Sequence, residues 1–331
     1  MDNNKETIFS GIKATGKMHI GNYLGAIKNW VKLQDSGKYN TIYSIVDLHS
    51  LTIDIPAEEL RENILAMAID LLACGINPEK SILYIQSNVP AHTELAWIFN
   101  CIIPIAELEK MTQFKDKAKL HKENVNAGLF DYPALMAADI LLYQATAVPV
   151  GIDQEQHVEL TRKIAKKFNN RWGNFFEEPK SLMTQTPKLM ALNDPSKKMS
   201  KELGDKSYIS LSDTPEIVKE KIMKAVTDTG GAKDRDPGGR ALLDLFKAFV
   251  DDEQITMKFE EDYNKGELQY SKFKPMLANV IIGALKPIQA KRQELEKNPE
   301  AILEILKQGA QQANLLAEQT LKEVRNKIGL I

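Results

Sequence analysis

The run from Phe9 to Tyr23 constrains the fold more than any other part of the chain, because it combines a strand, a glycine-bearing turn and a helix start. Residues Thr7–Ile12 are largely β-branched and apolar, which predicts a buried strand. Apolar residues then recur at helical spacing over Ile20–Gln34, which predicts a helix. Its N-terminus would offer unpaired N–H groups to an anion, with His19 and Asn22 as added donors. The competing interpretation is an ordinary strand–turn–helix with a surface histidine.

Strands and helices alternate through the first half of the chain. Further strands are predicted at Asn40–Val46, Ser81–Ser87 and Ala145–Gly151, and a helix at Ala57–Leu72 separates the first two. Strands that alternate with helices pair in parallel through right-handed crossovers. The predicted fold class is therefore α/β, with a Rossmann-like doubly wound parallel sheet. Ligands of such sheets bind beyond the carboxyl ends of the strands, which is where His49 falls.

The second half of the chain changes to helices. A last short strand is predicted at Lys188–Leu192, and helices are predicted at Ser212–Val226, Arg240–Val250, Lys272–Glu296 and Pro299–Ile328. These helices carry Lys219, Lys221, Lys224, Lys272 and Lys274. The pattern predicts a Rossmann-like domain at 1–192, a loop linker at 193–207, a helical domain at 208–310 and a C-terminal helix at 311–331 that packs back on the first domain.

Composition limits the partners of the chain. A net charge of −2 gives no overall attraction to nucleic acid, so any RNA must bind to local basic faces. The lysine-rich stretch Glu107–Asn124 is either a solvated helix face or a contact to RNA or a triphosphate. Without a secretory leader or an apolar membrane span, the chain is expected to be cytoplasmic. Cys74 and Cys101 are predicted to be buried free thiols, and no metal-ligand spacing is present.

Asp139 interrupts an almost wholly apolar helix at Tyr132–Tyr143. A buried carboxylate is costly unless a donor meets it, so Asp139 must have a partner. That partner is either a donor within the fold or a substrate N–H. After the strand at Ala145–Gly151, Asp153 and Gln154 could hold a ribose hydroxyl or an ammonium, although helix capping competes for Asp153.

Two short motifs resemble the signatures of class I aminoacyl-tRNA synthetases. The letters HIGN from His19 to Asn22 resemble the HIGH signature, with asparagine in place of the second histidine. The letters KMSK from Lys198 to Lys201 resemble the KMSKS loop, with Glu202 in place of the final serine. Each motif is weak by itself, but the pair in this order and separation is fairly specific.

Over essentially its whole length the chain is similar to bacterial tryptophanyl-tRNA synthetases. The most specific segments are YPALMAADILLY, which begins at Tyr132, and VPVGIDQEQHVELTRKIAKKFN, which begins at Val148. The resemblance implies a sheet of the HUP type, a helical C-terminal domain that binds the tRNA anticodon, and a homodimer in the cytoplasm.

The same resemblance implies the ligation of L-tryptophan to tRNA(Trp) in two steps. The tryptophan carboxylate attacks the α-phosphorus of ATP, and a ribose hydroxyl of tRNA then attacks the aminoacyl adenylate. ATP and Mg²⁺ are the implied cofactors, with Mg²⁺ held by phosphate oxygens and water and by no dedicated protein site. His19, Lys198 and Lys201 are the implied catalytic residues, because they would stabilise charge on the leaving pyrophosphate.

The resemblance also assigns the binding residues. Asp139 would accept the indole N–H, with seven further tryptophan-binding residues: Phe9, Gly11, His49, Met136, Val148, Val150 and Gln154. An acceptor that tyrosine or phenylalanine leaves unpaired would discriminate by about 1–3 kcal/mol. The implied ATP-binding residues are Lys13, Ala14, Thr15, Gly21, Asn22, Gly151, Ile152, Asp153, Leu189, Lys198, Met199, Ser200, Lys201 and Glu202.

Three other functions stay open on the sequence. A tyrosyl-tRNA synthetase shares the fold and both signatures, and differs in the amino acid that supports activation. A small-molecule nucleotidylyltransferase shares the chemistry of the first signature, but would not require the long helical C-terminal region. A non-catalytic paralogue would bind tryptophan or RNA without turnover. His19, Lys198 and Lys201 argue against this alternative, and Glu202 keeps it open.

Overall fold

The computed structural model describes residue 2 and residues 4–112, 125–151, 154–183, 189–227 and 237–330. The chain forms two compact units. The first consists of Met1–Gly16, Trp30–Thr184 and Asn298–Ile331, and the second of Lys17–Asn29 and Gln185–Lys297. The predicted domains 1–192, 193–207, 208–310 and 311–331 divide the chain by function, and that division stays a prediction.

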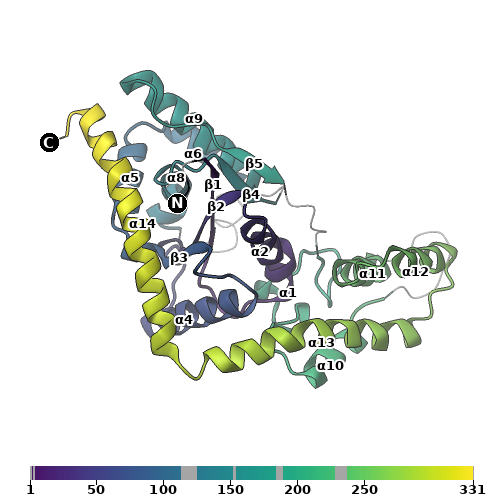
Figure 1. The fold of residues 1–331 in the computed structure, drawn as a ribbon. Coiled ribbons are helices and arrows are strands. Elements are labelled where there is room, and N and C mark those ends of the chain that lie inside the picture. Colours follow the sequence, from purple (N-terminus) through teal and green to yellow (C-terminus); the bar gives the residue numbers. More distant parts are fainter. Residues whose placement is uncertain are drawn as a thin grey trace. The chain divides into compact units, whose positions relative to one another are not determined.

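A five-stranded parallel sheet forms the centre of the first unit (Figure 1). Its strand order is β3-β2-β1-β4-β5. The strands are β1 (Glu6–Ile12), β2 (Tyr39–Ile45), β3 (Ser81–Ile85), β4 (Ala147–Val150) and β5 (Lys180–Met183). The chain builds outward from β1 to β3 and then returns to add β4 and β5 on the other side of β1, which is the doubly wound arrangement. The predicted Rossmann-like parallel sheet followed by helices is confirmed.

The strand predicted at Lys188–Leu192 is wrong. The fifth strand lies earlier, at Lys180–Met183, where no residue is fully buried because β5 is an edge strand. An edge strand with one exposed face lacks the apolar run by which the buried strands were found. From Leu189 to Leu192 only Met190 forms a bridge, an isolated antiparallel one to Lys198, and Lys188 lies outside the described residues.

Alternate strand residues pack on opposite faces of the sheet. On one face, Phe9 and Ile42 join a core with helices α5 (Ala91–Asn100), α8 (Ala127–Leu141), α9 (Glu155–Trp172) and α14 (Pro299–Ile328). On the other face, Tyr43 stacks on Trp30 of α2 (Lys28–Asp35) with ring centroids 4.8 Å apart, and donates a 2.8 Å hydrogen bond to the Trp30 carbonyl. Helix α4 (Ala57–Ala73) packs against β2 and crosses over to β3.

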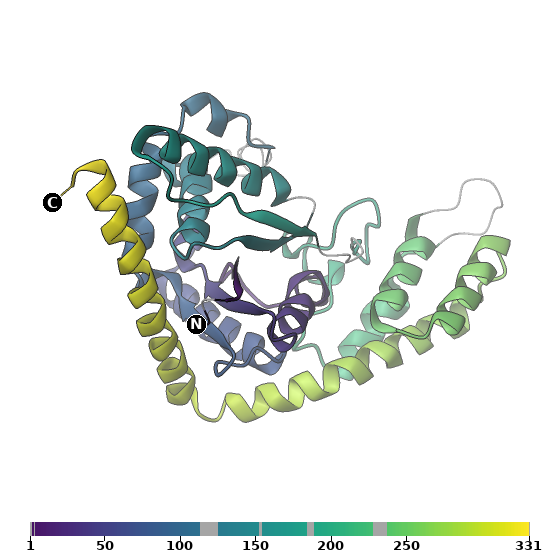
Figure 2. The same cartoon turned by 45° about the horizontal axis from the view of Figure 1, so that its top comes forward.

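Helix α14 lies against the backbone of the edge strand β3 (Figure 2). The closest approach is at Gly309, where an added Cβ would clash with the Leu83 carbonyl oxygen and lie 2.8 Å from its carbon. A covered edge strand cannot pair with another chain. Residue 310, predicted as a domain boundary, falls inside this continuous helix.

Gly309→Ala is expected to lower the free energy of unfolding by about 1–3 kcal/mol, because the β3 backbone cannot move away from the new methyl group. The matched control is Gly283→Ala on α13 (Tyr270–Leu295), where an added Cβ has no neighbour within 4 Å. There the higher helix propensity of alanine should stabilise the chain by up to about 1 kcal/mol. Thermal unfolding of both variants measures this contrast, and equal shifts would contradict it.

The second unit contains both signature motifs and is mostly helical. Its helices are α1 (Ile20–Asn22), the π-helical turn η1 (Tyr23–Ile27), α10 (Pro215–Lys224), α11 (Pro237–Phe249), α12 (Glu253–Lys265) and α13. Phe246, Phe259 and Phe273 join α11, α12 and α13 with ring centroids 5.3–5.6 Å apart. The predicted helix Ile20–Gln34 is therefore interrupted by a π-helical turn before α2. Helix α12 was not predicted, although the Asp252 side chain caps its start and Gly266 ends it in the left-handed conformation.

Three surface expectations can be compared with the structure. Of the helices in the described part of the chain, none is long and apolar enough to cross a membrane. Both cysteines are free, but Cys101 is exposed and Cys74 is half-buried, so the expected burial is wrong for Cys101. In the lysine-rich stretch, Lys110 pairs with Glu107 at 3.0 Å after α6 (Ile105–Glu109). The remaining lysines of that stretch lie outside the described residues: Lys115, Lys117, Lys119 and Lys122.

Candidate active site

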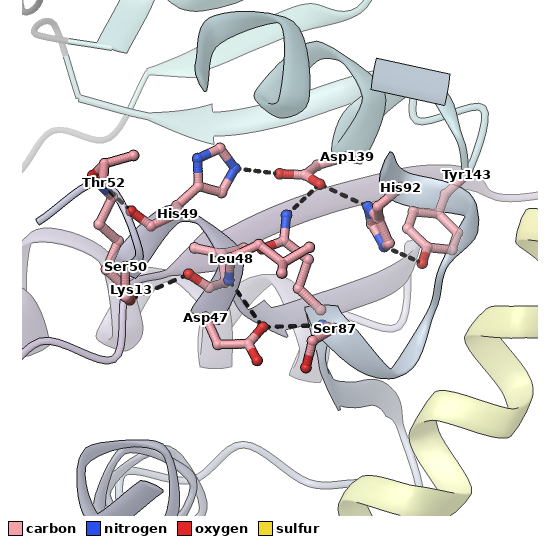
Figure 3. A network of polar contacts seen from close by, with 12 residues as sticks. Lys13, Asp47, Leu48, His49, Ser50, Thr52, Ser87, His92, Asp139 and Tyr143 are labelled. Carbon is pink, nitrogen blue, oxygen red and sulfur yellow. Dashed lines mark hydrogen bonds and ion pairs between the residues drawn. The ribbon is translucent and has the colours of Figure 1, made fainter. Parts of the chain in front are cut away.

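Asp139 is the centre of a buried polar network in the first unit (Figure 3). Its Oδ2 lies 2.8 Å from His49 Nε2, and its Oδ1 lies 2.6 Å from both Gln86 Nε2 and His92 Nδ1. His49 follows β2 on the short helix α3 (Asp47–Ser50), while Gln86 and His92 follow β3. The network therefore forms at the carboxyl ends of neighbouring parallel strands, where this type of sheet binds its ligands.

Asp139 is a carboxylate in this network. Burial alone would raise the pKa of Asp139, but the hydrogen bonds from His49 and His92 outweigh it and hold that pKa well below its usual range. Because a carboxylate only accepts, His49 carries a proton on Nε2 and His92 carries one on Nδ1. His92 Nε2 in turn lies 2.9 Å from the hydroxyl groups of both Tyr84 and Tyr143, so its ring is held from two sides.

One acceptor position of Asp139 remains. A carboxylate has about four lone-pair positions, two on each oxygen. Within the described part of the chain, Oδ1 receives Gln86 and His92, whereas Oδ2 receives His49 alone. Asp139 therefore has donors within the fold, which is the first alternative left open by the sequence. Oδ2 has capacity for one further N–H, and a substrate N–H at that position stays a prediction.

The apolar residues predicted to bind tryptophan lie on the two central strands. Ile8 of β1 is in register with Ala147 of β4. This register pairs Phe9 with Val148 and Gly11 with Val150, so these four predicted residues share one sheet face by strand alternation. This is the face covered by α8, because Phe9, Val148 and Val150 belong to the same buried core as Ala138 beside Asp139.

Two further predicted residues frame this face. Met136 is half-buried and precedes Asp139 by one helical turn on α8. Gln154 is half-buried at the N-cap of α9, and its N–H donates to the Gly151 carbonyl at 3.0 Å. The first unit thus contains all eight predicted tryptophan-binding residues, and their contacts to the ligand stay predictions.

Tyr132 belongs to this site, although the sequence pattern marked it only as a helix start. Its hydroxyl lies 2.8 Å from His157 Nε2, its ring meets His49 edge-on, and the Lys13 ammonium lies 5.7 Å from the ring centroid. Burial raises the pKa of Tyr132, so its hydroxyl keeps its proton. The sequence did contain a signal for this role of Tyr132. It lies seven residues before Asp139, and that spacing puts both side chains on one face of α8.

The turn predicted to contact ATP follows β1. Lys13 Nζ lies 3.5 Å from Thr52 Oγ1, while Ala14 is fully buried and can offer a ligand only its backbone. Thr15 is half-buried. Gly151, from the second predicted ATP-contacting stretch, directly follows β4, and its neighbours Ile152 and Asp153 lie outside the described residues.

His19 begins the helical segment of the second unit. Its Nδ1 accepts the N–H of Gly21 at 3.0 Å, and its own backbone N–H donates to Asn22 Oδ1 at 3.2 Å, which makes a reciprocal capping box. Because Nδ1 accepts, the ring proton is on Nε2. Asn22, which stands in place of the second histidine of the HIGH signature, therefore supports the helix cap with its side-chain amide.

The two signature motifs adjoin within the second unit. A Cβ at Gly21 would lie 2.7 Å from His19 Cε1 and 3.7 Å from Met199 Sδ, so only glycine fits between them. Burial, and then the charges of Lys201 and Lys198, lower the pKa of His19 to about 4. His19 is therefore neutral at neutral pH, and its Nε2–H and two ammonium groups form a site that favours anions.

The second signature is held in a narrow hairpin. Met199 N–H donates to the Leu189 carbonyl, and Ala191 N–H donates to the Lys197 carbonyl, each at 2.9 Å. The Ser200 hydroxyl then accepts the Glu202 N–H at 3.2 Å and caps the 3₁₀ turn η4 (Lys201–Leu203). Because this cap uses only the backbone of Glu202, its exposed side chain can replace the usual serine without breaking the turn.

Among the described residues, no group of three or more His, Cys, Asp or Glu side chains is placed to hold a metal ion.

The family model for class I tRNA synthetases (W and Y) matches residues 1–286 of the chain. A tryptophan–tRNA ligase of Clostridium tetani is 45% identical over 336 residues, which covers 100% of this chain and 98% of that protein. The chain belongs to the tryptophan–tRNA ligases of class I. This confirms the predicted family.

Solved structures agree with the tryptophan–tRNA ligase family. A tryptophanyl-tRNA synthetase from Mycoplasma pneumoniae superposes with a TM-score of 0.86 at 32% identity, covering 99% of this chain and 98% of that one. The enzyme from Campylobacter jejuni, complexed with ADP and tryptophan, has a TM-score of 0.81 at 34% identity, covering 98% and 100%. A tyrosyl-tRNA synthetase from Archaeoglobus fulgidus, at 22% identity and a TM-score of 0.68, shares the fold alone.

Proposed function

We propose that the protein joins L-tryptophan to tRNA(Trp) in two steps, with a tryptophanyl-adenylate formed from ATP in the first. The observation that carries this proposal is the buried Asp139 carboxylate. Within the described part of the chain three donors hold it in place, and one acceptor position is left on Oδ2. Membership in the family supports the reaction. The complex of the Campylobacter jejuni relative with ADP and tryptophan supports ATP and tryptophan as the substrates.

Selection of tryptophan rests on one polar contact in an apolar slot. The indole ring packs on the sheet face of Phe9, Val148 and Val150, and its N–H donates to Asp139 Oδ2. Phenylalanine fits the slot but has no side-chain donor. Tyrosine carries its O–H at the far end of a single ring, away from the position of the indole N–H, so both leave that acceptor position of Asp139 unpaired. Gly11, His49, Met136 and Gln154 complete the proposed pocket.

Activation of tryptophan needs no side-chain nucleophile, because the substrate carboxylate itself attacks the α-phosphorus. In the second unit His19 Nε2–H, Lys198 and Lys201 bind the phosphates and stabilise the charge that moves onto the leaving pyrophosphate. Met199, Ser200, Glu202, Leu189, Gly21 and Asn22 contact ATP beside them. Lys13–Thr15 and Gly151–Asp153 are the proposed contacts from the first unit.

Mg²⁺ enters this proposal as an ion carried by the ATP phosphates. It prefers phosphate oxygens and water to an all-protein site, and would neutralise charge on the departing pyrophosphate. The helical region 208–310 is the proposed reader of the tRNA anticodon. The cytoplasm, where ATP and tRNA meet, is the proposed location.

Amino-acid-dependent ATP–pyrophosphate exchange tests the proposal directly. The assay compares tryptophan, tyrosine and no amino acid in the same preparation. Exchange with tryptophan alone is the expected result, because only the indole N–H satisfies Asp139. Exchange with tyrosine would reassign the pocket, and no exchange with either amino acid would leave a non-catalytic binding protein.

A homodimer is also proposed, with the pairing surface in the first unit. A cavity of about 270 Å³ between α3, α5 and α8 is walled by His49 and Tyr132 from the polar network and by the apolar side chains of Leu51 and Trp97. Trp97 is 70% exposed and Leu51 58%. Two large, exposed apolar side chains at one cavity favour coverage by a second copy.

Trp97→Glu is expected to convert the dimer into a monomer, because the carboxylate would have to be buried in the interface without a partner. Sedimentation velocity would then show a mass near that of one 37.2 kDa chain. Leu315→Glu is the matched control, since Leu315 on α14 is 75% exposed and lies outside the cavity. A wild-type monomer, or a dimer that survives in Trp97→Glu, would contradict the assignment of this surface.

A further inference from the structure

Lys221 on helix α10 is a buried lysine of the second unit. Its Nζ lies 2.9 Å from Asp213 Oδ2 and 3.2 Å from Asp205 Oδ2. The same ammonium lies 5.1 Å from the centroid of the Tyr208 ring. Asp213 is buried with it, whereas Asp205 is exposed. One cation thus joins three residues of the segment that follows the KMSK motif.

Through Asp213, Lys221 is linked to the backbone that carries His19. Asp213 Oδ2 also accepts the Ser210 N–H at 2.9 Å. Ser210 forms an antiparallel bridge with His19, flanked by hydrogen bonds from Ile20 N–H to Ile209 O at 2.9 Å and from Leu211 N–H to Met18 O at 3.0 Å. The pairing of Ser210 with the first signature therefore depends on a carboxylate that Lys221 holds.

Through Asp205, the same lysine is linked to the second signature. Asp205 begins the 3₁₀ turn η5 (Asp205–Ser207). The hydroxyl of Ser207 at the end of that turn lies 2.7 Å from the carbonyl oxygen of Ser200, the serine of the KMSK motif. Tyr208 provides a third link, besides those through Asp213 and Asp205. Its ring lies under the Lys221 ammonium and 5.5 Å from the His19 ring.

We propose that Lys221 is a positioning residue for adenylate formation, which sets the backbone at His19 and the Ser200–Lys201 turn at their working separation. It touches neither substrate and acts through Asp213, Asp205 and Tyr208. The inference rests on the proposed roles of His19, Lys198 and Lys201 in binding the phosphates. Small displacements of groups that stabilise a transition state are costly in rate, whereas the tryptophan pocket belongs to the other unit and keeps its affinity.

The test uses Lys221→Met, which keeps the length and removes the charge, in the full-length chain. The kcat of tryptophan-dependent ATP–pyrophosphate exchange is expected to fall by about tenfold or more, while the tryptophan Kd stays within about twofold. Lys221→Arg keeps the charge and should recover most of the rate. The matched control is Lys219→Met, since Lys219 is exposed on the same helix and should leave the rate unchanged.

A double-mutant cycle with Lys201→Ala separates positioning from general destabilisation. If Lys221 acts through the KMSK turn, its tenfold loss should shrink to about threefold or less once Lys201 is gone. Full additivity of the two losses would overturn the proposal. So would a Lys221→Met variant with a lower melting temperature but an unchanged exchange kcat, because that result describes a purely structural lysine.

Asp205→Asn covers the case in which Lys221→Met does not fold. It removes only the exposed partner, so the chain stays folded, and the exchange kcat is expected to fall by about threefold. An unchanged kcat in that variant would contradict the proposal. Failure of the proposed function looks different, since wild type would then show no tryptophan-dependent exchange before any variant is compared.

Discussion

Asp139→Asn is expected to lower kcat/KM for tryptophan activation by about 10- to 150-fold, because a hydrogen bond to a buried charged acceptor contributes about 1.5–3 kcal/mol. The amide keeps the shape of the carboxylate but replaces one acceptor oxygen by a donor. That donor would face either the N–H of His49 or the paired donors Gln86 and His92. In each orientation the indole N–H loses a charged acceptor.

The loss should appear mainly in the KM for tryptophan, with the KM for ATP within about twofold of wild type, since the indole contact is made in ground state and transition state alike. Steady-state exchange kinetics measure both constants. Asp131→Asn is the matched control: the same change on the same helix, at a half-buried carboxylate that receives Asn100 Nδ2 at 3.0 Å. Wild-type constants for tryptophan in Asp139→Asn would refute the pocket assignment.

Lys201→Ala is expected to lower the rate of adenylate formation by about 10²–10³-fold, the usual loss when one donor that stabilises transition-state charge is removed. Tryptophan should bind with unchanged affinity, because the Asp139 network belongs to the other unit. Rapid-quench measurement of adenylate in a single turnover separates the chemical step from product release.

The charge of Lys201 also acts on His19. Together with burial and Lys198 it lowers the His19 pKa to about 4, so its removal should raise that pKa towards the ordinary value. His19 still stays neutral at pH 8, and an assay there isolates the loss of the ammonium group. Lys197→Ala is the matched control in the same loop, because Lys197 is exposed and pairs with Asp194 at 3.0 Å. Full-rate adenylate formation in Lys201→Ala would show that the KMSK loop is misassigned.

The partners of Asp139 could be predicted only in part from the sequence. A carboxylate on an apolar helix must have a donor, and that requirement follows from burial alone. The identity of the donors does not, because His49, Gln86 and His92 lie 90, 53 and 47 residues away along the chain. His49 was found from its place beyond a strand end and from the family resemblance, whereas Gln86 and His92 were missed. Residues so distant meet only when parallel strands bring their carboxyl ends together.

The lysines of the helical region do not all lie on the surface. Periodicity and composition assign a lysine to the surface, and Lys219 follows that rule. Lys221 does not, because Asp213 and the Tyr208 ring cover it and compensate its charge. The edge strand β5 was missed because its residues are not fully buried. It therefore lacks the apolar pattern by which buried strands are recognised in a sequence.

Residue spacing was enough to predict the alternation of strands and helices, the parallel sheet that follows from it, and the two signatures that mark the family. These features depend on spacing within one segment, where the helical and strand periods can be recognised. The donors that hold Asp139, the lysine that joins the two signatures and the contact of α14 with β3 at Gly309 became apparent only in the folded chain. Those contacts join segments far apart in the chain, and periodicity reports that a side chain is buried without reporting what buries it.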